Sequence, residues 1–317
     1  MYLNKKFWNN KTLAVTGSTG FVGKRLIKIV NSELENKINL IEITRKKYDL
    51  TEYNDLKKIF KNNQIDYMIH LAATVGGIGA NQKNPAKFFY ENAFMGINLM
   101  HLSYINKIKK FVTLASVCGY PQKAKIPFKE EDLWKGYPEE TNAPYGIAKK
   151  ILTVQSEAYR KQYKFNSIVL YPVNLYGPGD NFDLNTSHVI PALIRKVLYA
   201  KKTSSNSIKV WGDGKAYREF LYVDDLVEAI LLATEKYNNS EPINIGTGDM
   251  ISIKSLVKLI CKKCEYTGNI EWEKNKPNGQ IYRQLDVSKS KKYIGFQSKT
   301  NIEEGLEKTI NWYKNNH

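Results

Sequence analysis

The segment that most constrains the fold lies near the N-terminus, where residues 12–30 read TLAVTGSTGFVGKRLIKIV. An apolar strand is followed by a glycine-rich turn and an amphipathic helix, and Gly17, Gly20 and Gly23 have the spacing GxxGxxG. In such a turn the first glycine permits the tight bend, the second lets the backbone approach a pyrophosphate, and the third lets the helix pack closely. The phosphates then lie at the helix N-terminus, where free N–H groups and the helix dipole favour anions. The position directly after the first strand favours this interpretation over an ordinary glycine turn.

Apolar runs alternate with helix-like stretches along the first half of the chain. The runs lie near residues 12–16, 39–44, 65–71, 110–115, 166–171 and 242–245. This alternation predicts an α/β protein with a Rossmann-type, doubly wound parallel sheet. After about residue 175 the chain becomes rich in Gly, Asp, Asn and aromatic residues, which suits a smaller α/β substrate-binding domain. We therefore expect a dinucleotide-binding domain over residues 1–175 and a mainly substrate-binding domain over 176–317. The two are expected to interleave, with the strand near 242–245 returning to the first sheet.

Three polar residues predict the chemistry. Tyr145 and Lys149 stand four residues apart in PYGIAKK, and Ser116 lies upstream in TLASVCGY. On a helix, residues at i and i+4 share a face, so the Lys149 ammonium is expected to lower the pKa of the Tyr145 hydroxyl. A serine hydroxyl at the end of a neighbouring strand completes the site by donating to a carbonyl oxygen. This set moves a proton to or from an alcohol or ketone oxygen while a hydride moves at the carbon.

The end of the second predicted strand indicates which dinucleotide is bound. The strand reads LIEITRKK, which places Arg45, Lys46 and Lys47 at or just beyond its end. An enzyme that uses NAD usually has an acidic residue there for the ribose hydroxyls, whereas basic groups suit a 2′-phosphate. The sequence therefore predicts NADPH. Glu42 is the competing candidate but lies earlier in the strand, and a merely solvated Arg45 remains the alternative.

Composition excludes several other classes. The net charge of +17 is spread over the 317 residues without a basic tail, which argues against nucleic acid and favours an anionic nucleotide-linked substrate. No apolar run is long enough to span a membrane, and the opening MYLNKKFWNNK has no apolar core of a signal peptide. Three cysteines make no disulfide framework, so we expect a cytoplasmic protein. Cys261 and Cys264 form a CxxC within a helical pattern, and without a second ligand pair no metal site is predicted.

Longer motifs carry a resemblance to a known family. With the glycine turn and the Ser116, Tyr145 and Lys149 set, the chain resembles the extended short-chain dehydrogenases/reductases. Within that superfamily it resembles the GDP-L-fucose synthase family over essentially its full length. The segments that carry this likeness are HLAATVGGIGANQKNPAKFFYEN, TNAPYGIAK, NLYGPGDNF, SHVIPALIRK, VWGDGKAYREFLYVDD, INIGTGDMISI and KPNGQIYRQLDV.

The resemblance implies an NADPH-dependent oxidoreductase that also acts as an isomerase. Members of the family epimerise a GDP-linked 4-keto-6-deoxy sugar at C-3 and C-5 and then reduce C-4. The family's epimerisation pair maps onto Cys118 and His188, a thiolate to remove a proton and an imidazolium to return one. Taken alone, Cys118 reads as a small buried residue and His188 as a structural histidine. His70, in HLAA, is expected to support the site from beneath the cofactor.

The resemblance also implies binding roles and a homodimer. The implied cofactor-binding residues are Gly17, Thr19, Gly20, Phe21, Val22 and Gly23 at the pyrophosphate, Arg45 at the 2′-phosphate, Asp49 and Leu50 at the adenine, Leu71, Ala72, Ala73 and Leu114 along the cofactor, and Lys149, Pro172, Asn174, Leu175 and His188 near the nicotinamide. The implied substrate-binding residues are Val117, Asn174, Lys196, Trp211 and Arg218. The helical stretches beginning NPAKFF and APYGIA are expected to pair across a two-fold axis, as in the superfamily.

Departures from the family pattern leave the sugar open. Val117 replaces a usual serine, Gly179 stands where the family often has histidine, and Ser18-Thr19 replaces a common arginine. The alternative function is therefore C-4 reduction alone, on a GDP-4-keto-heptose or another GDP-4-keto deoxysugar for surface polysaccharide synthesis. A dehydratase of the superfamily is disfavoured, because it needs an Asp-Glu pair where Val117-Cys118 stand. A dinucleotide-sensing protein without activity would not need the Ser/Tyr/Lys set.

Overall fold

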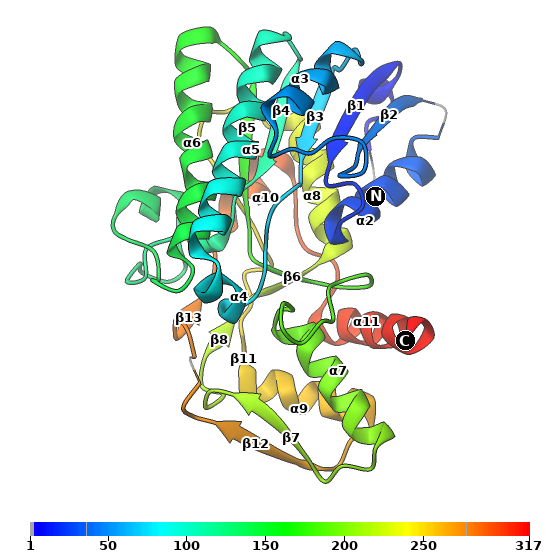
Figure 1. Ribbon diagram of the computed structural model, residues 1–317, viewed down its shortest axis with the longest axis vertical. Helices are drawn as coiled ribbons and strands as arrows, with labels where there is room; N and C mark the ends of the chain where they lie inside the picture. The colour runs from blue at the N-terminus through cyan, green and yellow to red at the C-terminus, as the bar shows by residue number, and fades with distance from the viewer. Residues whose placement is uncertain (1–2, 36, 277) are drawn as a thin grey trace.

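A computed structural model describes residues 3–35, 37–276 and 278–317. Its upper lobe in Figure 1 is built on a six-stranded sheet in the order β10-β5-β4-β3-β1-β2, and every pair of neighbours is parallel. The predicted Rossmann-type sheet is confirmed. The strands are β1 (Lys11–Thr16), β2 (Ile38–Ile43), β3 (Tyr67–His70), β4 (Lys110–Leu114), β5 (Ser167–Pro172) and β10 (Ile243–Ile245).

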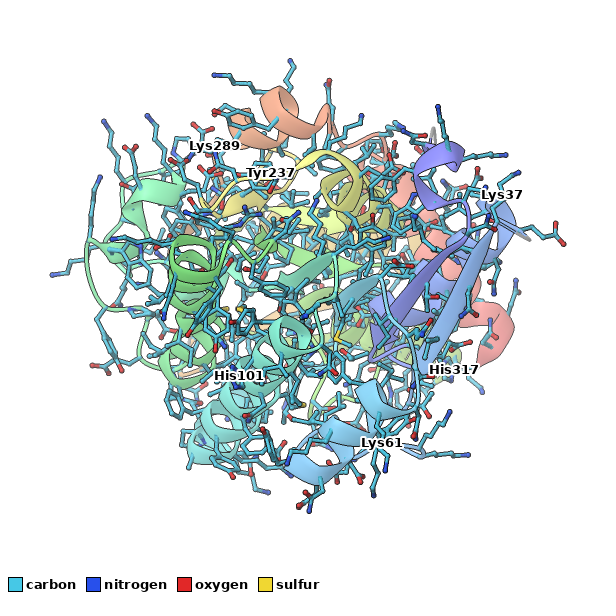
Figure 2. The ribbon with its side chains drawn as sticks, turned by 90° about the horizontal axis from the view of Figure 1, so that it is seen from above. Lys37, Lys61, His101, Tyr237, Lys289 and His317 are labelled. Carbon is cyan, nitrogen blue, oxygen red and sulfur yellow. The ribbon has the colours of Figure 1, made fainter. Side chains whose placement is uncertain are left out.

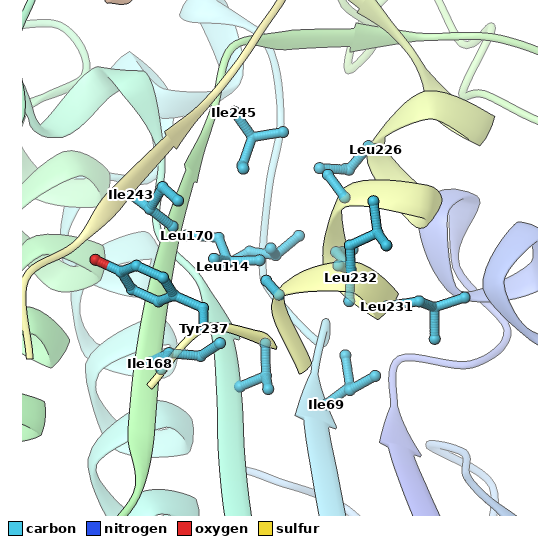
Figure 3. Close-up of a cluster of buried hydrophobic side chains, with 14 of the residues drawn as sticks. Ile69, Leu114, Ile168, Leu170, Leu226, Leu231, Leu232, Tyr237, Ile243 and Ile245 are labelled. Atoms are coloured by element: carbon cyan, nitrogen blue, oxygen red, sulfur yellow. The ribbon is translucent and has the colours of Figure 1, made fainter. Parts of the chain in front are cut away.

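Helices cover both faces of this sheet, because successive side chains of a strand point to opposite sides. On one side Ala14 and Met68 pack with residues of α3, α5 and α6, and on the other Leu13 and Ile69 pack with residues of α2 and α8. Figure 3 shows α8 on the sheet, with Leu226 facing Ile245 and Leu231 above Ile69. The helices of the upper lobe are α1 (Lys5–Trp8), α2 (Phe21–Glu33), α3 (Tyr53–Lys61), α4 (Ile78–Lys83), α5 (Pro85–Ile105), α6 (Ala143–Tyr163), α8 (Val223–Lys236) and α10 (Ser288–Ile294).

The lower lobe in Figure 1 has its own core, formed by residues such as Ile194, Ile208, Leu256 and Leu306. Its β7 and β12 pair in parallel, β8 lies between β11 and β13, and β6 pairs with β9. The elements are α7 (Val189–Lys202), α9 (Ile253–Cys264), α11 (Ile302–Asn316), β6 (Asn174–Tyr176), β7 (Ser207–Trp211), β8 (Tyr217–Arg218), β9 (Phe220–Tyr222), β11 (Ile251–Ser252), β12 (Asn269–Glu273) and β13 (Tyr282–Arg283).

Segments after residue 175 contribute to both lobes. The strand β10 pairs with β5 at one edge of the large sheet, and α8 packs on one face. The ion pair of Arg25 with Asp224 joins α2 to α8, and Asp225 accepts hydrogen bonds from the backbone of Lys299 and Thr300. The last segment of the chain is thus tied to the sheet through α8.

The surplus positive charge is distributed over the molecule. Figure 2 labels Lys37, Lys61 and Lys289 at well separated positions around its outline. No helix in the described part of the chain is long and apolar enough to cross a membrane. Cys261 and Cys264 are buried free thiols on α9, and burial raises the pKa of Cys264 to about 11. Both side chains therefore belong to the hydrophobic core of the lower lobe.

A buried carboxylate holds the two lobes in register. Glu219 is fully buried, and its side chain accepts hydrogen bonds from the backbone N–H groups of Thr247 (2.6 Å), Gly248 (2.8 Å) and Leu285 (2.8 Å). Its backbone carbonyl accepts from the Asn174 amide at 3.0 Å. The residue thus joins the turn after β10, the segment after β13 and the start of β6. Burial raises the pKa of Glu219, and these hydrogen bonds oppose that effect.

Replacing this carboxylate should destabilise the whole chain. In Glu219→Ala three backbone N–H groups lose their acceptor, one of them in a buried and two in half-buried hydrogen bonds, so we expect the free energy of unfolding to fall by roughly 3 kcal/mol. Urea unfolding followed by tryptophan fluorescence measures the change. The matched variant Glu307→Ala removes an exposed carboxylate that pairs with Lys263 and should leave the midpoint unchanged. Equal midpoints for the two variants would contradict the proposed role of Glu219.

Candidate active site

The glycine turn after β1 is packed backbone to backbone. Gly17 has a φ of +69°, and a Cβ there would lie 2.7 Å from the amide nitrogen of Ala72, beyond β3. A Cβ at Gly23 would lie 2.1 Å from the Gly17 carbonyl oxygen. The Gly20 amide donates to that same oxygen at 2.9 Å. Gly17 and Gly23 therefore have the conformational and packing roles expected of them, and Gly20 precedes the first turn of α2 with its open N–H groups.

Thr19, Phe21 and Val22 complete this turn, and Leu71, Ala72 and Ala73 follow β3 beside it. The two segments meet because the sheet order reverses between β1 and β3, the place where open α/β sheets bind ligands. The residues of both segments are half-buried, apart from the exposed Thr19.

His70 supports this junction from within the core. Its Nδ1 lies 2.8 Å from the Thr16 hydroxyl, which also accepts from the Ala72 amide at 3.2 Å. Burial lowers the pKa of His70 well below its usual value, and the positive charge of Lys149 adds to that shift. A neutral His70 therefore fixes the geometry of the segment that follows β3.

The end of β2 places a basic residue outside the sheet. Arg45 is exposed two positions beyond Ile43, whereas Glu42 lies within β2 and pairs with Val15. Asp49 accepts from the backbone and hydroxyl of Thr51, and these hydrogen bonds lower its pKa, with a further contribution from Arg45. Leu50 beside it is buried. Arg45 is thus the first charged side chain beyond the end of β2.

The catalytic candidates converge at the end of β4. Ser116 follows this strand and caps a short 3₁₀ turn, η1 (Val117–Gly119), by accepting from the Cys118 amide at 3.2 Å. Tyr145 and Lys149 lie on α6, which packs against η1. The contact is close, because a Cβ at Gly146 would lie 2.3 Å from the Cys118 carbonyl oxygen. Ser116 lies near enough to Tyr145 that its side chain opposes a rise in the tyrosine pKa.

The electrostatics of this set differ from the expectation. Burial raises the pKa of the Tyr145 hydroxyl, with a contribution from Cys118, and the hydrogen bond with Ser116 only partly opposes it. Burial also lowers the pKa of Lys149 to about 8. The expected lowering of the tyrosine pKa by lysine is therefore wrong for this arrangement, since desolvation outweighs the attraction. The phenol is held protonated at neutral pH, the state that a proton donor requires.

Cys118 has a charged neighbour that the sequence analysis missed. Arg283, on β13, donates from Nη1 to the Cys118 sulfur at 3.6 Å and is only 7% exposed. It lies directly beside Arg218, because β8 and β13 pair in parallel with these residues in register. The signal available was its place in KPNGQIYRQLDV, one of the segments that carry the resemblance.

His188 comes from the other lobe. It occupies the N-cap position of α7, and the loop before it accepts a hydrogen bond at Thr186 from the Gly77 amide at 3.1 Å. A Cβ at Gly77 would lie 2.8 Å from the Ser187 carbonyl oxygen, so the VGGIGAN segment abuts this loop. His188 keeps an exposed side chain, yet enough protein surrounds it that desolvation lowers its pKa. Within the described residues no hydrogen bond joins it to Cys118.

The substrate-binding candidates lie mainly in the lower lobe. Lys196 donates from Nζ to the Lys209 carbonyl at 2.8 Å, and Trp211, 47% exposed, ends β7 near Gly79 of the VGGIGAN segment. Asn174 and Leu175 begin β6, after Pro172 at the end of β5, and Leu114 ends β4. Val117, by contrast, is only 3% exposed and packs in the core of the upper lobe. Little of its side chain is therefore available to a ligand.

Arg218 shapes the loop before β13. Its guanidinium donates to the backbone carbonyls of Tyr217 (2.8 Å), Ile281 (3.4 Å) and Asn278 (3.0 Å). A guanidinium has about five N–H donors, so about two remain for a ligand. Burial and the neighbouring Arg283 lower the pKa of Arg218 to about 9. A surface hollow of about 610 Å³ lies elsewhere, along α11, and contains no site candidate.

Comparisons with known proteins show the family to which the chain belongs. A model of the NAD dependent epimerase/dehydratase family matches residues 13–246. The GDP-L-fucose synthase of Sinorhizobium fredii (strain NBRC 101917 / NGR234) is 39% identical, over 100% of this chain and 98% of its own. A crystal structure of a GDP-6-OMe-4-keto-L-xylo-heptose reductase from C. jejuni has a TM-score of 0.91 and 28% identity, covering 97% of this chain and 99% of its own. A GDP-mannoheptose C4 reductase from Campylobacter jejuni with NADP bound has a TM-score of 0.86 and 30% identity, covering 96% and 99%.

Arg45 should set the preference between dinucleotides. We expect the chain to use NADPH better than NADH. Arg45→Ala should raise the Michaelis constant for NADPH by roughly tenfold and leave that for NADH unchanged, since only the 2′-phosphate loses its partner. Arg45→Lys should lie between them because it keeps the charge and loses the bidentate fork. Lys61→Ala, an exposed cation at the end of α3, is the control. A wild type that prefers NADH would overturn the assignment and direct attention to Glu42.

Proposed function

The chain belongs to the NAD dependent epimerase/dehydratase family and, within it, to the GDP-L-fucose synthase family, and we propose that it reduces the C-4 ketone of a GDP-4-keto-6-deoxy sugar with NADPH, coupled to epimerisation at C-3 and C-5. One observation carries the proposal. Ser116 and Cys118 at the end of β4 lie near enough to Tyr145 to shift its pKa, and Lys149 lies one helical turn beyond Tyr145 on α6. This set fits both a proton transfer at a carbonyl oxygen and a proton transfer at the adjacent carbon.

In the reduction, Tyr145 donates its proton to the C-4 oxygen. Burial keeps the phenol protonated, and Ser116 holds the same oxygen by a second hydrogen bond. NADPH, when bound, supplies the hydride. Its pyrophosphate fits the glycine turn, where a side chain at Gly17 or Gly23 would strike the backbone. Lys149 lies one helical turn beyond Tyr145 and carries a positive charge below its pKa of about 8.

In the epimerisation, Cys118 and His188 act at carbon. The thiolate takes the proton from the carbon next to the ketone. The C–H electron pair becomes the C=C bond of the enolate, and the π pair of the C=O bond moves to the C-4 oxygen, where Ser116 and Tyr145 stabilise the negative charge. His188 returns a proton to the opposite face of that carbon. Desolvation lowers the pKa of His188, which makes the protonated ring a stronger acid.

A second candidate is reduction of C-4 without epimerisation, on a GDP-4-keto-heptose used for surface polysaccharides. The likeness to the C. jejuni heptose reductases favours it. So does Gly179, where the family often has histidine. It has a φ of +84°, and a Cβ there would meet no atom within 4 Å. A larger sugar would have space at this point.

The two lobes have separate roles in this proposal. Residues 1–175 bind the dinucleotide and residues 176–317 mainly the GDP-sugar, with Lys196, Trp211 and Arg218 at the nucleotide. The free thiols and the absence of a described membrane-spanning helix suit an enzyme of the cytoplasm. Nucleic acid is not a proposed partner, because the positive charges are dispersed.

The exposed face of α5 and α6 fits a homodimer. Tyr90 (60%), Ile97 (39%) and Ile105 (52%) are exposed on α5, and Val154 (51%) and Tyr163 (40%) on α6. The α5 residues recur at near-helical spacing and so form one apolar stripe, and α6 packs alongside. Two copies of such a face bury each other in an isologous interface.

The oligomeric state should depend on this apolar face of α5 and α6. Light scattering at micromolar concentration should give twice the chain mass for the wild type and the chain mass for the double variant Ile97→Asp, Val154→Asp. The reason is that a buried, unpaired carboxylate at each site costs more than the interface gains. Tyr199→Asp places the same charge on an exposed aromatic of α7 and should remain dimeric. A monomeric wild type would exclude this interface.

Tyr145 should be indispensable for reduction. Tyr145→Phe removes the proton donor, so turnover of a GDP-4-keto sugar with NADPH should fall by about two orders of magnitude or more. NADPH affinity, measured by fluorescence titration, should persist because the ring remains. Tyr171→Phe removes a buried hydroxyl that bonds Thr153 and is the control. Near-normal turnover in Tyr145→Phe would refute the reduction mechanism.

Deuterium exchange should separate the two candidate functions. In deuterated water without NADPH, an epimerising enzyme should label a GDP-4-keto-6-deoxy sugar at C-3 and C-5, which NMR detects. Cys118→Ser should suppress labelling more strongly than it suppresses reduction of an already epimerised substrate, since exchange needs a base at carbon. Reduction by the wild type with no labelling would leave C-4 reduction alone as the function.

A further inference from the structure

The buried guanidinium of Arg283 has an unusual partner. Its Nη1 donates to the Cys118 sulfur at 3.6 Å and its Nε to the Gln280 side chain at 3.3 Å. Gln280 in turn donates to the Gln122 carbonyl at 2.8 Å. No ion pair of Arg283 with a carboxylate occurs among residues 3–35, 37–276 and 278–317. A cation that is 7% exposed is costly without an anion, so the sulfur is the nearest group that could supply one.

We propose that Arg283 is a positioning residue for Cys118: it stabilises the sulfur as a thiolate and holds it at the end of η1, facing the Tyr145 hydroxyl. An adjacent cation favours the thiolate over the thiol, and the thiolate is the nucleophilic and basic form. The use of this thiolate on a sugar rests on the proposed function, whereas the reactivity of the sulfur does not.

Two side chains of α6 that lie near η1 have other roles. Tyr145 faces the sulfur, but burial keeps its phenol protonated and uncharged at neutral pH. Lys150 passes beside Gly119 and then donates its ammonium hydrogen to the Leu133 carbonyl, with its charge over the Trp134 ring. Neither residue therefore supplies a positive charge to the sulfur.

The groups on β8 and in the loop before α6 have other partners. Arg218 contributes a weaker charge, since burial and Arg283 lower its pKa to about 9 and three backbone carbonyls accept its N–H groups. Glu139 contributes to the electrostatics of the Arg218 guanidinium, and its carboxylate accepts from Thr141 and Asn142. Arg283 is thus the charged side chain that contacts the Cys118 sulfur directly.

Alkylation of the full-length chain by iodoacetamide tests this directly, because the thiolate displaces iodide far faster than the thiol does. Peptide mass spectrometry follows Cys118 separately from Cys261 and Cys264, which are buried and report any loss of folding. At pH 7 we expect Arg283→Gln to react at Cys118 about tenfold more slowly than the wild type, the size expected for loss of one adjacent charge. Arg283→Lys should restore part of the rate. At pH 10, which lies above the ordinary pKa of an accessible thiol, the variants should react alike at Cys118.

A matched control and two possible results test whether the charge of Arg283 activates Cys118. Arg195→Gln removes one charge from a guanidinium that donates to the Phe182 carbonyl, and it should leave the Cys118 rate unchanged. An unchanged rate in Arg283→Gln at pH 7, or an equal slowing at pH 7 and pH 10, would overturn the proposal, since the second result means access and not charge. The alkylation rates at Cys118 can follow the expected order while the wild type exchanges no deuterium into the sugar. That combination would refute epimerisation and leave the role of Arg283 intact.

Discussion

The buried carboxylate of Glu219 is the interaction on which the site depends. It accepts three backbone N–H groups from two separate segments and so fixes the strands on which two arginines lie. Arg218 precedes it directly, and Arg283 lies two residues before Leu285, one of its donors. Because a buried carboxylate is tolerated only with its hydrogen bonds complete, the positions of these segments are mutually determined. The lower lobe thereby presents its charges to the catalytic turn of the upper lobe.

Glycines allow segments of the upper lobe to pack closely enough to form the site. At Gly17 and Gly23 the chain approaches itself so closely that any Cβ would strike backbone, and at Gly146 the helix α6 lies against η1 for the same reason. The last contact sets the distance between Tyr145 on the helix and Ser116 in the loop. The proposed catalytic pair is thus positioned by a residue that has no side chain.

Burial decides the protonation states. The Tyr145 hydroxyl and the Lys149 ammonium lie in a region where desolvation dominates, so the pKa of the phenol rises and that of the lysine falls. Both shifts favour neutral forms. A phenol that holds its proton is suited to deliver it to a ketone oxygen, and the thiol of Cys118 then needs a charged neighbour to act as a base. Arg283 lies where such a neighbour is required.

The sequence by itself determined the parallel sheet, the glycine turn and the Ser116, Tyr145 and Lys149 set, because these follow from local periodicity and from residues close together along the chain. Only the tertiary structure decided the contact of Arg283 with Cys118, the burial of Val117 and the direction of the Tyr145 pKa. Residues 118 and 283 are 165 positions apart, and the segments after each of them are joined by the bridge between Phe128 and Leu285, a long-range contact that no local pattern encodes. Desolvation likewise depends on all the atoms packed around a group. The i and i+4 spacing of Tyr145 and Lys149 predicts only the attraction between these two side chains, and not the burial that raises the tyrosine pKa.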